Sequence, residues 1–109
     1  MSGINPAEVH PLATLVTLTP DSVVSRILHK NGASNITLFA FGQGQGLSTH
    51  TAPFDAFVLV TEGEAVVTID EQKHAVATGQ CVLMPANIPH SVHAAKDFKM
   101  LLVMLKEQN

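Results

Sequence analysis

The sequence predicts an all-β domain in which short antiparallel strands close into a barrel. Runs of about four to eight residues rich in Val, Ile, Leu, Thr and Phe recur along the chain, and turn-forming residues separate them. Hydrophobic residues make up 46% of the chain and charged residues only 14%, so ample apolar surface is available for a core. Many short strands at this spacing are typical of a sandwich or a barrel, and closure into a barrel removes exposed sheet edges.

The expected extended segments follow one another along most of the chain. In chain order they are Thr14–Leu18, Val23–His29, Asn35–Phe41, Ser48–Ala52, Ala56–Thr61, Glu64–Asp70, His74–Ala77, Cys81–Met84, His90–Ala94 and Lys99–Leu105. Turn residues such as Lys30-Asn31-Gly32 and Glu62-Gly63 connect them. Before the first strand, Asn5-Pro6-Ala7-Glu8 matches the start of a helix, which Pro11 limits to about one turn.

The length predicts a single domain. A chain of 109 residues can form one core but is too short for two cores of ordinary size. We expect residues 1–34 to be an N-terminal flap with flanking strands, and residues 35–109 to be the barrel of the same domain. With no Trp or Tyr and only five Phe, the core must be mainly aliphatic, with four Met residues as adaptable filling.

Charge and targeting patterns exclude some classes of partner. The net charge is −3, and the Lys and Arg residues are scattered, so no basic surface for nucleic acid or an anionic membrane is expected. One cysteine cannot form an intrachain disulfide, and neither a signal peptide nor a membrane span is evident. These features predict a cytoplasmic protein.

The glycine-rich segment Gly42-Gln43-Gly44-Gln45-Gly46 invites comparison with phosphate-binding loops. No Lys-Ser/Thr pair follows it, and Leu47 occupies the third glycine position of the dinucleotide fingerprint. We therefore expect a loop that needs permissive backbone angles before the strand that carries His50.

Cys81 is a second candidate for chemistry, as a nucleophile served by His90 or His93. It lies within the apolar run Cys81–Met84, where a small buried residue is expected. The structural interpretation is therefore the expected one.

Two segments place histidines within a regular arrangement of glycines and prolines. The first runs from Gly44 through His50 to Gly63, and the second runs from Gly79 through Pro85 to His90. Over roughly residues 35 to 105 the chain resembles the cupin family, whose motifs are G-x5-H-x-H-x3-4-E-x6-G and G-x5-P-x-G-x2-H-x3-N. Asn87 takes the place of the internal glycine of the second motif, and Asn is the best substitute for glycine at positive φ. Ala94 takes the place of the final Asn of that motif.

The resemblance implies a double-stranded β-helix, or jelly-roll, barrel with its site in the lumen. The family includes dioxygenases, isomerases, decarboxylases and ligand-sensing domains, so the fold alone does not select an activity. This sequence departs from the first motif, since the places of its second His and its Glu fall on Ala52 and Ala56. A divalent transition metal, Fe, Mn, Ni or Zn, is the implied cofactor.

Strand parity decides which side chains can join His50 and His90 in the lumen. Asp55 has the parity opposite to His50, but a bulge at Pro53 would turn it inward. His50, His90 and Asp55 would then form a two-histidine, one-carboxylate metal set. Without Asp55, the two histidines bind metal weakly or simply line a pocket. His93 faces away from His90 in a strand, so we expect it outside the lumen.

The sequence therefore predicts a barrel that binds a small, partly apolar molecule near His50 and His90, with a partial metal site. The alternative is a divalent-metal-dependent dioxygenase, isomerase or decarboxylase acting on a small oxygen-bearing substrate. A purely structural module would be favoured if side chains filled the lumen. The apolar run Met100–Leu105 and the N-terminal strands exceed what one small barrel can bury, which predicts a homodimer.

Overall fold

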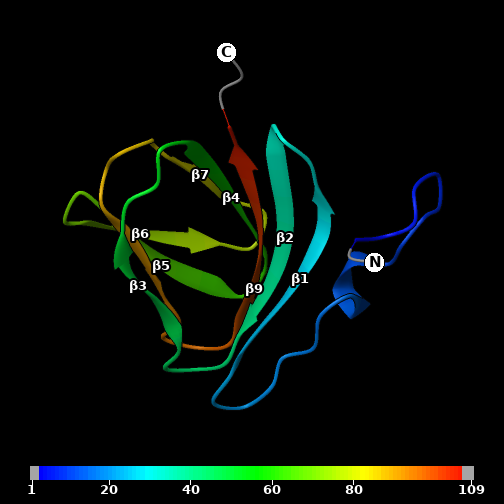
Figure 1. Ribbon diagram of the computed structural model, residues 1–109. Helices are drawn as coiled ribbons and strands as arrows, with labels where there is room; N and C mark the ends of the chain where they lie inside the picture. Colours follow the sequence, from blue (N-terminus) through cyan, green and yellow to red (C-terminus); the bar gives the residue numbers. More distant parts are fainter. Residues whose placement is uncertain (1–2, 107–109) are drawn as a thin grey trace.

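The computed structural model describes residues 3–106 of the chain, which form two antiparallel β-sheets (Figure 1). The order across the first sheet is β1 (Val23–Lys30), β2 (Ser34–Phe41), β9 (Phe98–Leu105), β4 (Asp55–Glu62) and β7 (Cys81–Met84). The order across the second sheet is β3 (Gly46–His50), β8 (His90–His93), β5 (Glu64–Ile69) and β6 (Gln72–Ala77). Strands that are distant in sequence lie side by side, as in a jelly roll. The predicted all-β class and jelly-roll barrel are confirmed.

The main core lies between the two sheets. On β4 the side chains of Ala56, Val58 and Val60 are buried, whereas the alternate side chains are half-buried on the outer face. At the end of the barrel away from the start of β4, the rings of Phe41 and Phe98 stack with centroids 4.6 Å apart. This end of the lumen is therefore filled by side chains. The buried members of this core are Phe41, Ala56, Val58, Val60, Ala65, Val67, Val76, Met84, Val92, Ala94, Phe98, Met100 and Leu102.

A second, smaller core covers the outer face of the first sheet. Val16 of the N-terminal segment is buried with Leu28, Leu38 and Ala40 of β1 and β2. Figure 1 shows this segment, in blue, beside β1. The Lys99 side chain fixes it, because its Nζ donates a hydrogen bond to the Ala13 carbonyl at 2.8 Å.

Two expectations for the N-terminal segment are wrong. The segment predicted as a strand at Thr14–Leu18 is instead a 3-10 turn, Leu12–Thr14, followed by irregular chain. Its apolar side chains pack onto a sheet face, where no neighbouring strand is available for backbone pairing. The helix expected at Asn5 does not form, since Ala7 has φ of 59° and the chain makes a turn.

The other strands agree with the prediction to within about two residues at each end. The glycine-rich segment is a loop leading into β3, as expected. Gly44 has φ of 86°, and Gly46 lies so close to the Val92 carbonyl of β8 that no Cβ would fit. Asn87 has φ of 64°, which confirms its role as a substitute for glycine. Within residues 3–106, no helix is long and apolar enough to cross a membrane.

Candidate functional site

The structure brings His50 and His90 together on neighbouring strands. His50 ends β3 and lies directly opposite His90, the first residue of β8. Their rings meet edge to face, with centroids 4.4 Å apart. His90 is only 4% exposed, whereas His50 is open to solvent. The two candidates predicted from the motif resemblance therefore form a pair at one end of the barrel.

Backbone carbonyls fix the orientation of both rings. His50 Nδ1 lies 2.8 Å from the Ser48 carbonyl oxygen, and His90 Nδ1 lies 3.0 Å from that of Ile88. A carbonyl oxygen only accepts hydrogen bonds, so each Nδ1 carries the proton and donates it. In the neutral ring, Nε2 then keeps its lone pair for a metal or for a hydrogen-bond donor.

Burial keeps His90 in the neutral form. Loss of hydration around the ring lowers the pKa of His90 below the ordinary histidine value, and repulsion from His50 lowers it further. The hydrogen bond to the Ile88 carbonyl opposes this shift without cancelling it. At neutral pH the Nε2 atom of His90 is therefore unprotonated, and its lone pair is available to a metal ion or a hydrogen-bond donor.

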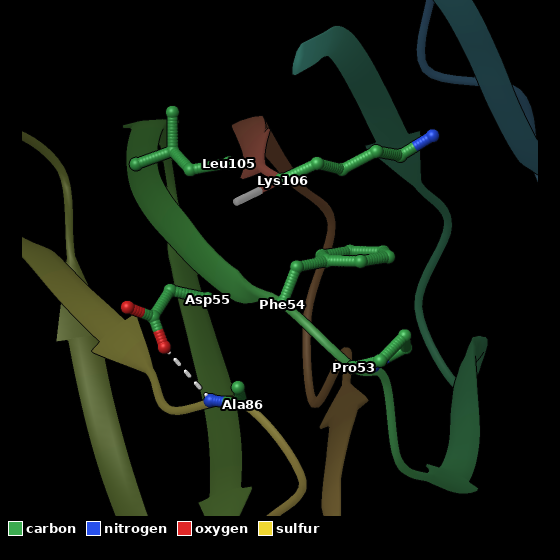
Figure 2. Close-up of a pocket in the computed structure, with 6 residues that line it drawn as sticks. All are labelled: Pro53, Phe54, Asp55, Ala86, Leu105 and Lys106. Carbon is green, nitrogen blue, oxygen red and sulfur yellow. Dashed lines mark hydrogen bonds between the residues drawn. The ribbon is translucent and has the colours of Figure 1, made fainter. Parts of the chain in front are cut away.

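The pairing of β4 shows no bulge that would turn Asp55 inward, and Asp55 does not join the histidines. The pairing of β4 with β9 is regular from Asp55 to Val60, and Asp55 lies opposite Leu105 on the outer side. Its Oδ1 accepts a hydrogen bond from the Ala86 amide at 2.8 Å, as Figure 2 shows. Pro53 precedes the strand, so it disturbs no pairing within it. Across residues 3–106, no group of three or more His, Cys, Asp or Glu side chains is arranged to hold a metal ion.

Asp55 instead helps to form a hollow of about 440 Å³ at the barrel rim (Figure 2). The hollow also contains Phe54 and Lys106, and the Lys106 Nζ lies 6.0 Å from the centre of the Phe54 ring. In Figure 2 the Asp55 carboxylate points toward Ala86, away from the Phe54 ring. The carboxylate thus ties the start of β4 to the loop between β7 and β8.

Alanines occupy the two motif positions where the further ligands are missing. Ala56 is 3% exposed within the main core and lies between Met84 and Met104 on the adjacent strands. This position faces the lumen, as parity predicts, but offers only a methyl group. The Ala52 carbonyl accepts the Asn87 amide at 2.7 Å, which links the two motif segments.

His93 and Cys81 lie on the outside of the barrel. His93 is exposed and pairs with Val66 and Gly46, so its expected position outside the lumen is confirmed. The expectation that Cys81 is buried is wrong, because it is exposed. It starts an edge strand opposite Leu59, and parity gives the inner face to its neighbour Val82. Its strand pairs with β4, whereas both proposed histidine partners lie on β8 of the other sheet.

Sequence reasoning missed a polar pair on the inner wall. Asn35 and Thr37 of β2 are 9% and 5% exposed, and the Thr37 hydroxyl donates to Asn35 Oδ1 at 2.6 Å. They share strand parity with Phe39 and Phe41, which contact the main core. Polar residues at alternate positions before two inward aromatic residues were the signal that could have revealed them.

Comparisons with known proteins identify the family and support the fold. The family model described as cupin domain matches residues 37–105. A conserved protein of unknown function from Streptococcus pyogenes is 38% identical over 100% of this chain and 98% of its own, with a TM-score of 0.91. A cupin superfamily protein from Desulfitobacterium hafniense is 29% identical over 97% of both chains, with a TM-score of 0.89. A cupin 2 conserved barrel domain protein from Leptotrichia buccalis is 36% identical over 86% of this chain and 46% of its own, with a TM-score of 0.84. Among curated proteins, none matches this chain.

Proposed function

This chain belongs to the cupin family, and on that basis we propose that its barrel binds a small, at least partly apolar molecule beside His50 and His90, which form a partial metal site. One observation carries the proposal. The two imidazoles lie in contact on neighbouring strands, and each has its Nδ1 bonded to the backbone and its Nε2 without a protein partner within residues 3–106.

The surroundings of the pair support an apolar ligand. Ile69 lies directly opposite His90 on β5. In the other sheet, a row of three apolar side chains lies at the same end on adjacent strands: Met84, Ala56 and Met104. Methionine side chains adapt to ligands of different shape. The proposed ligand therefore has an apolar body and few polar groups.

The donor set fits a divalent transition metal only in part. Two neutral imidazole nitrogens suit Fe, Mn, Ni or Zn, and His50 and His90 would hold the ion through Nε2. When bound, the ion would act as a Lewis acid toward an oxygen atom of the ligand. Because Ala52 and Ala56 supply no further ligand, the affinity is expected to be low. We favour binding over catalysis, since within residues 3–106 no further His, Cys, Asp or Glu side chain completes a metal site with the pair.

Metal titration tests the proposal directly. Protein purified without a chelator or a metal-affinity resin is titrated with Ni(II) by calorimetry, together with the variants His90→Ala and His93→Ala. We expect weak one-site binding in the wild type, its loss in His90→Ala and no change in His93→Ala. Unchanged binding in His90→Ala would refute the assignment of the site.

We also propose that the chain forms a homodimer. The N-terminal segment covers the outer face over β1 and β2, but the same face over β9, β4 and β7 carries half-buried Phe57, Leu59 and Val103. Leu83 and Leu105, on the same outer face, are about half exposed. A second copy of the chain is the occupant that would bury this row on both molecules by symmetry.

A further inference from the structure

The amide nitrogen of Asn35 has no protein partner among residues 3–106. Its Oδ1 accepts the hydroxyl of Thr37, and no hydrogen bond is made by Nδ2. Every fully buried polar side-chain atom in this part of the chain does have a partner. The Asn35 nitrogen therefore touches accessible space, although the residue as a whole is nine-tenths buried. A hydrogen-bond donor in a mostly apolar wall raises the free energy of the folded protein unless a ligand or a water molecule supplies an acceptor.

The register places this donor at the histidine end of the lumen. Asn35 lies opposite Met104, and Met104 lies opposite Ala56, so one row of side chains crosses β2, β9 and β4. Across the barrel, β4 contacts β6 and β9 contacts β5. Continuing the two strand orders places β2 over β8, the strand that begins with His90.

Two cations flank Asn35 at the same rim. Lys30 is its direct partner on β1, and Lys106 follows the end of β9 and extends over Phe54 (Figure 2). The carboxylate of Asp55 faces outward and is bonded to Ala86. Asp70 and Glu71 lie at this end too, but they belong to the other sheet, on the turn between β5 and β6. The wall that carries Asn35 thus has two lysines near it, and the hollows that they line also contain Asp55 beside Lys106 and Glu8 beside Lys30.

We propose that the lumen selects a small organic acid, whose carboxylate accepts a hydrogen bond from Asn35 Nδ2 and is attracted by Lys106 and Lys30. Its apolar body lies against Met104 and Met84. This inference rests on the proposed function, because it assigns a ligand class to the same lumen. Thr37 is a positioning residue, since its hydroxyl donates to Asn35 Oδ1 and so leaves the amide nitrogen as the group available to the ligand.

Carboxylates of increasing chain length, from acetate to octanoate, are the probes, with hexan-1-ol as the neutral match for hexanoate. Binding is followed by the NMR shifts of the methionine methyl groups in metal-free protein. We expect saturable shifts at Met104 and Met84 with hexanoate, none at the deeply buried Met100, and affinity for hexan-1-ol lower by roughly tenfold or more.

Four variants isolate the residues. Asn35→Asp keeps the acceptor for Thr37 but replaces the donor with a charge that repels the ligand, and Asn35→Leu removes the donor without adding charge. Both are expected to weaken hexanoate binding by roughly tenfold or more. Lys106→Met is expected to weaken it a few-fold, whereas Lys96→Met, at the opposite end of β9, leaves it unchanged.

Three results would overturn the inference: no carboxylate shifts Met104, hexan-1-ol binds as well as hexanoate, or Asn35→Asp binds hexanoate like the wild type. None of these results depends on the Ni(II) titration, which tests the proposed metal site separately. Conversely, loss of Ni(II) binding with intact hexanoate binding would reject the metal site and leave the ligand class standing.

Discussion

Replacing Gly46 with alanine is expected to separate the two motif strands and disrupt the histidine pair. The Cβ of an alanine at this position would collide with the Val92 carbonyl oxygen on β8. That oxygen belongs to the backbone, so it cannot rotate away as a flexible side chain would. The strain is relieved only if β3 moves away from β8, which carries His50 away from His90.

Two other glycines provide the scale for this change. At Gly79 the φ of 83° makes alanine strained, but a Cβ meets nothing within 4 Å, so the cost is about 1–2 kcal/mol. At Gly32 neither problem exists, and alanine should be close to neutral. At Gly46, overpacking costs about 1–3 kcal/mol. The backbone pairing of Gly46 with His93 and of Leu47 with Val92 is also weakened, so the total loss of folding stability is roughly 2–4 kcal/mol.

Thermal unfolding and Ni(II) titration of the three variants distinguish strain from displacement. For a domain of this size, 1 kcal/mol shifts Tm by about 4–8 °C, so Gly46→Ala should lower Tm by roughly 10–20 °C and Gly79→Ala by roughly half as much. At a temperature where all three are folded, only Gly46→Ala should lose Ni(II) affinity. Equal Ni(II) binding in Gly46→Ala and Gly79→Ala would refute the reasoning that β3 and β8 are held together through this contact.

Three further outcomes are expected. The double variant Ala52→His, Ala56→Glu should raise Ni(II) affinity steeply in calorimetry, at a cost of about 1–3 kcal/mol per enlarged side chain; a folded variant with wild-type affinity would show that these positions do not line the site. Because the pKa of His90 is lower in the folded than in the unfolded state, stability against urea should fall as pH drops below about 6.5, by at most about 1.4 kcal/mol per pH unit from this group. His90→Gln should reduce that slope, and an unchanged slope would contradict the burial argument. Light scattering should give a dimer mass that Leu83→Lys with Leu105→Lys converts to a monomer, and a wild-type monomer at micromolar concentration would reject the dimer.

The barrel strands could be predicted because each is a short run rich in apolar and β-branched residues that turn residues bound. Cys81–Met84 was predicted with its observed bounds. Thr14–Leu18 has the same composition, yet its side chains cover the outer face of a finished sheet. A local sequence pattern indicates that a segment buries apolar side chains. It does not indicate whether a neighbouring strand is free to form backbone hydrogen bonds with that segment.

The histidine pair could be predicted because the spacing of its histidines, glycines and prolines resembles the cupin motifs. Asp55 could not be placed, because its carboxylate is held by the Ala86 amide, which reaches it only after β4 and β7 have paired. Cys81 was misjudged because edge strands of a jelly roll expose apolar-looking runs that would be buried in a central strand. Asn35 and Thr37 escaped notice since polar residues in strands are ordinarily assigned to the outer face.

The N-terminal segment has a practical consequence for anyone who cuts this protein into fragments. The family match spans residues 37–105, but a polypeptide trimmed to those limits would lose β1 and the turn that Lys99 holds. Leu38 and Ala40, which have no exposed surface in the whole chain, would then face water beside a newly opened strand edge. Such a fragment should self-associate through β2 and come out of solution. The unit that can be expressed and purified on its own therefore extends toward the N-terminus at least as far as Ile4, whose amide bonds to the Leu28 carbonyl.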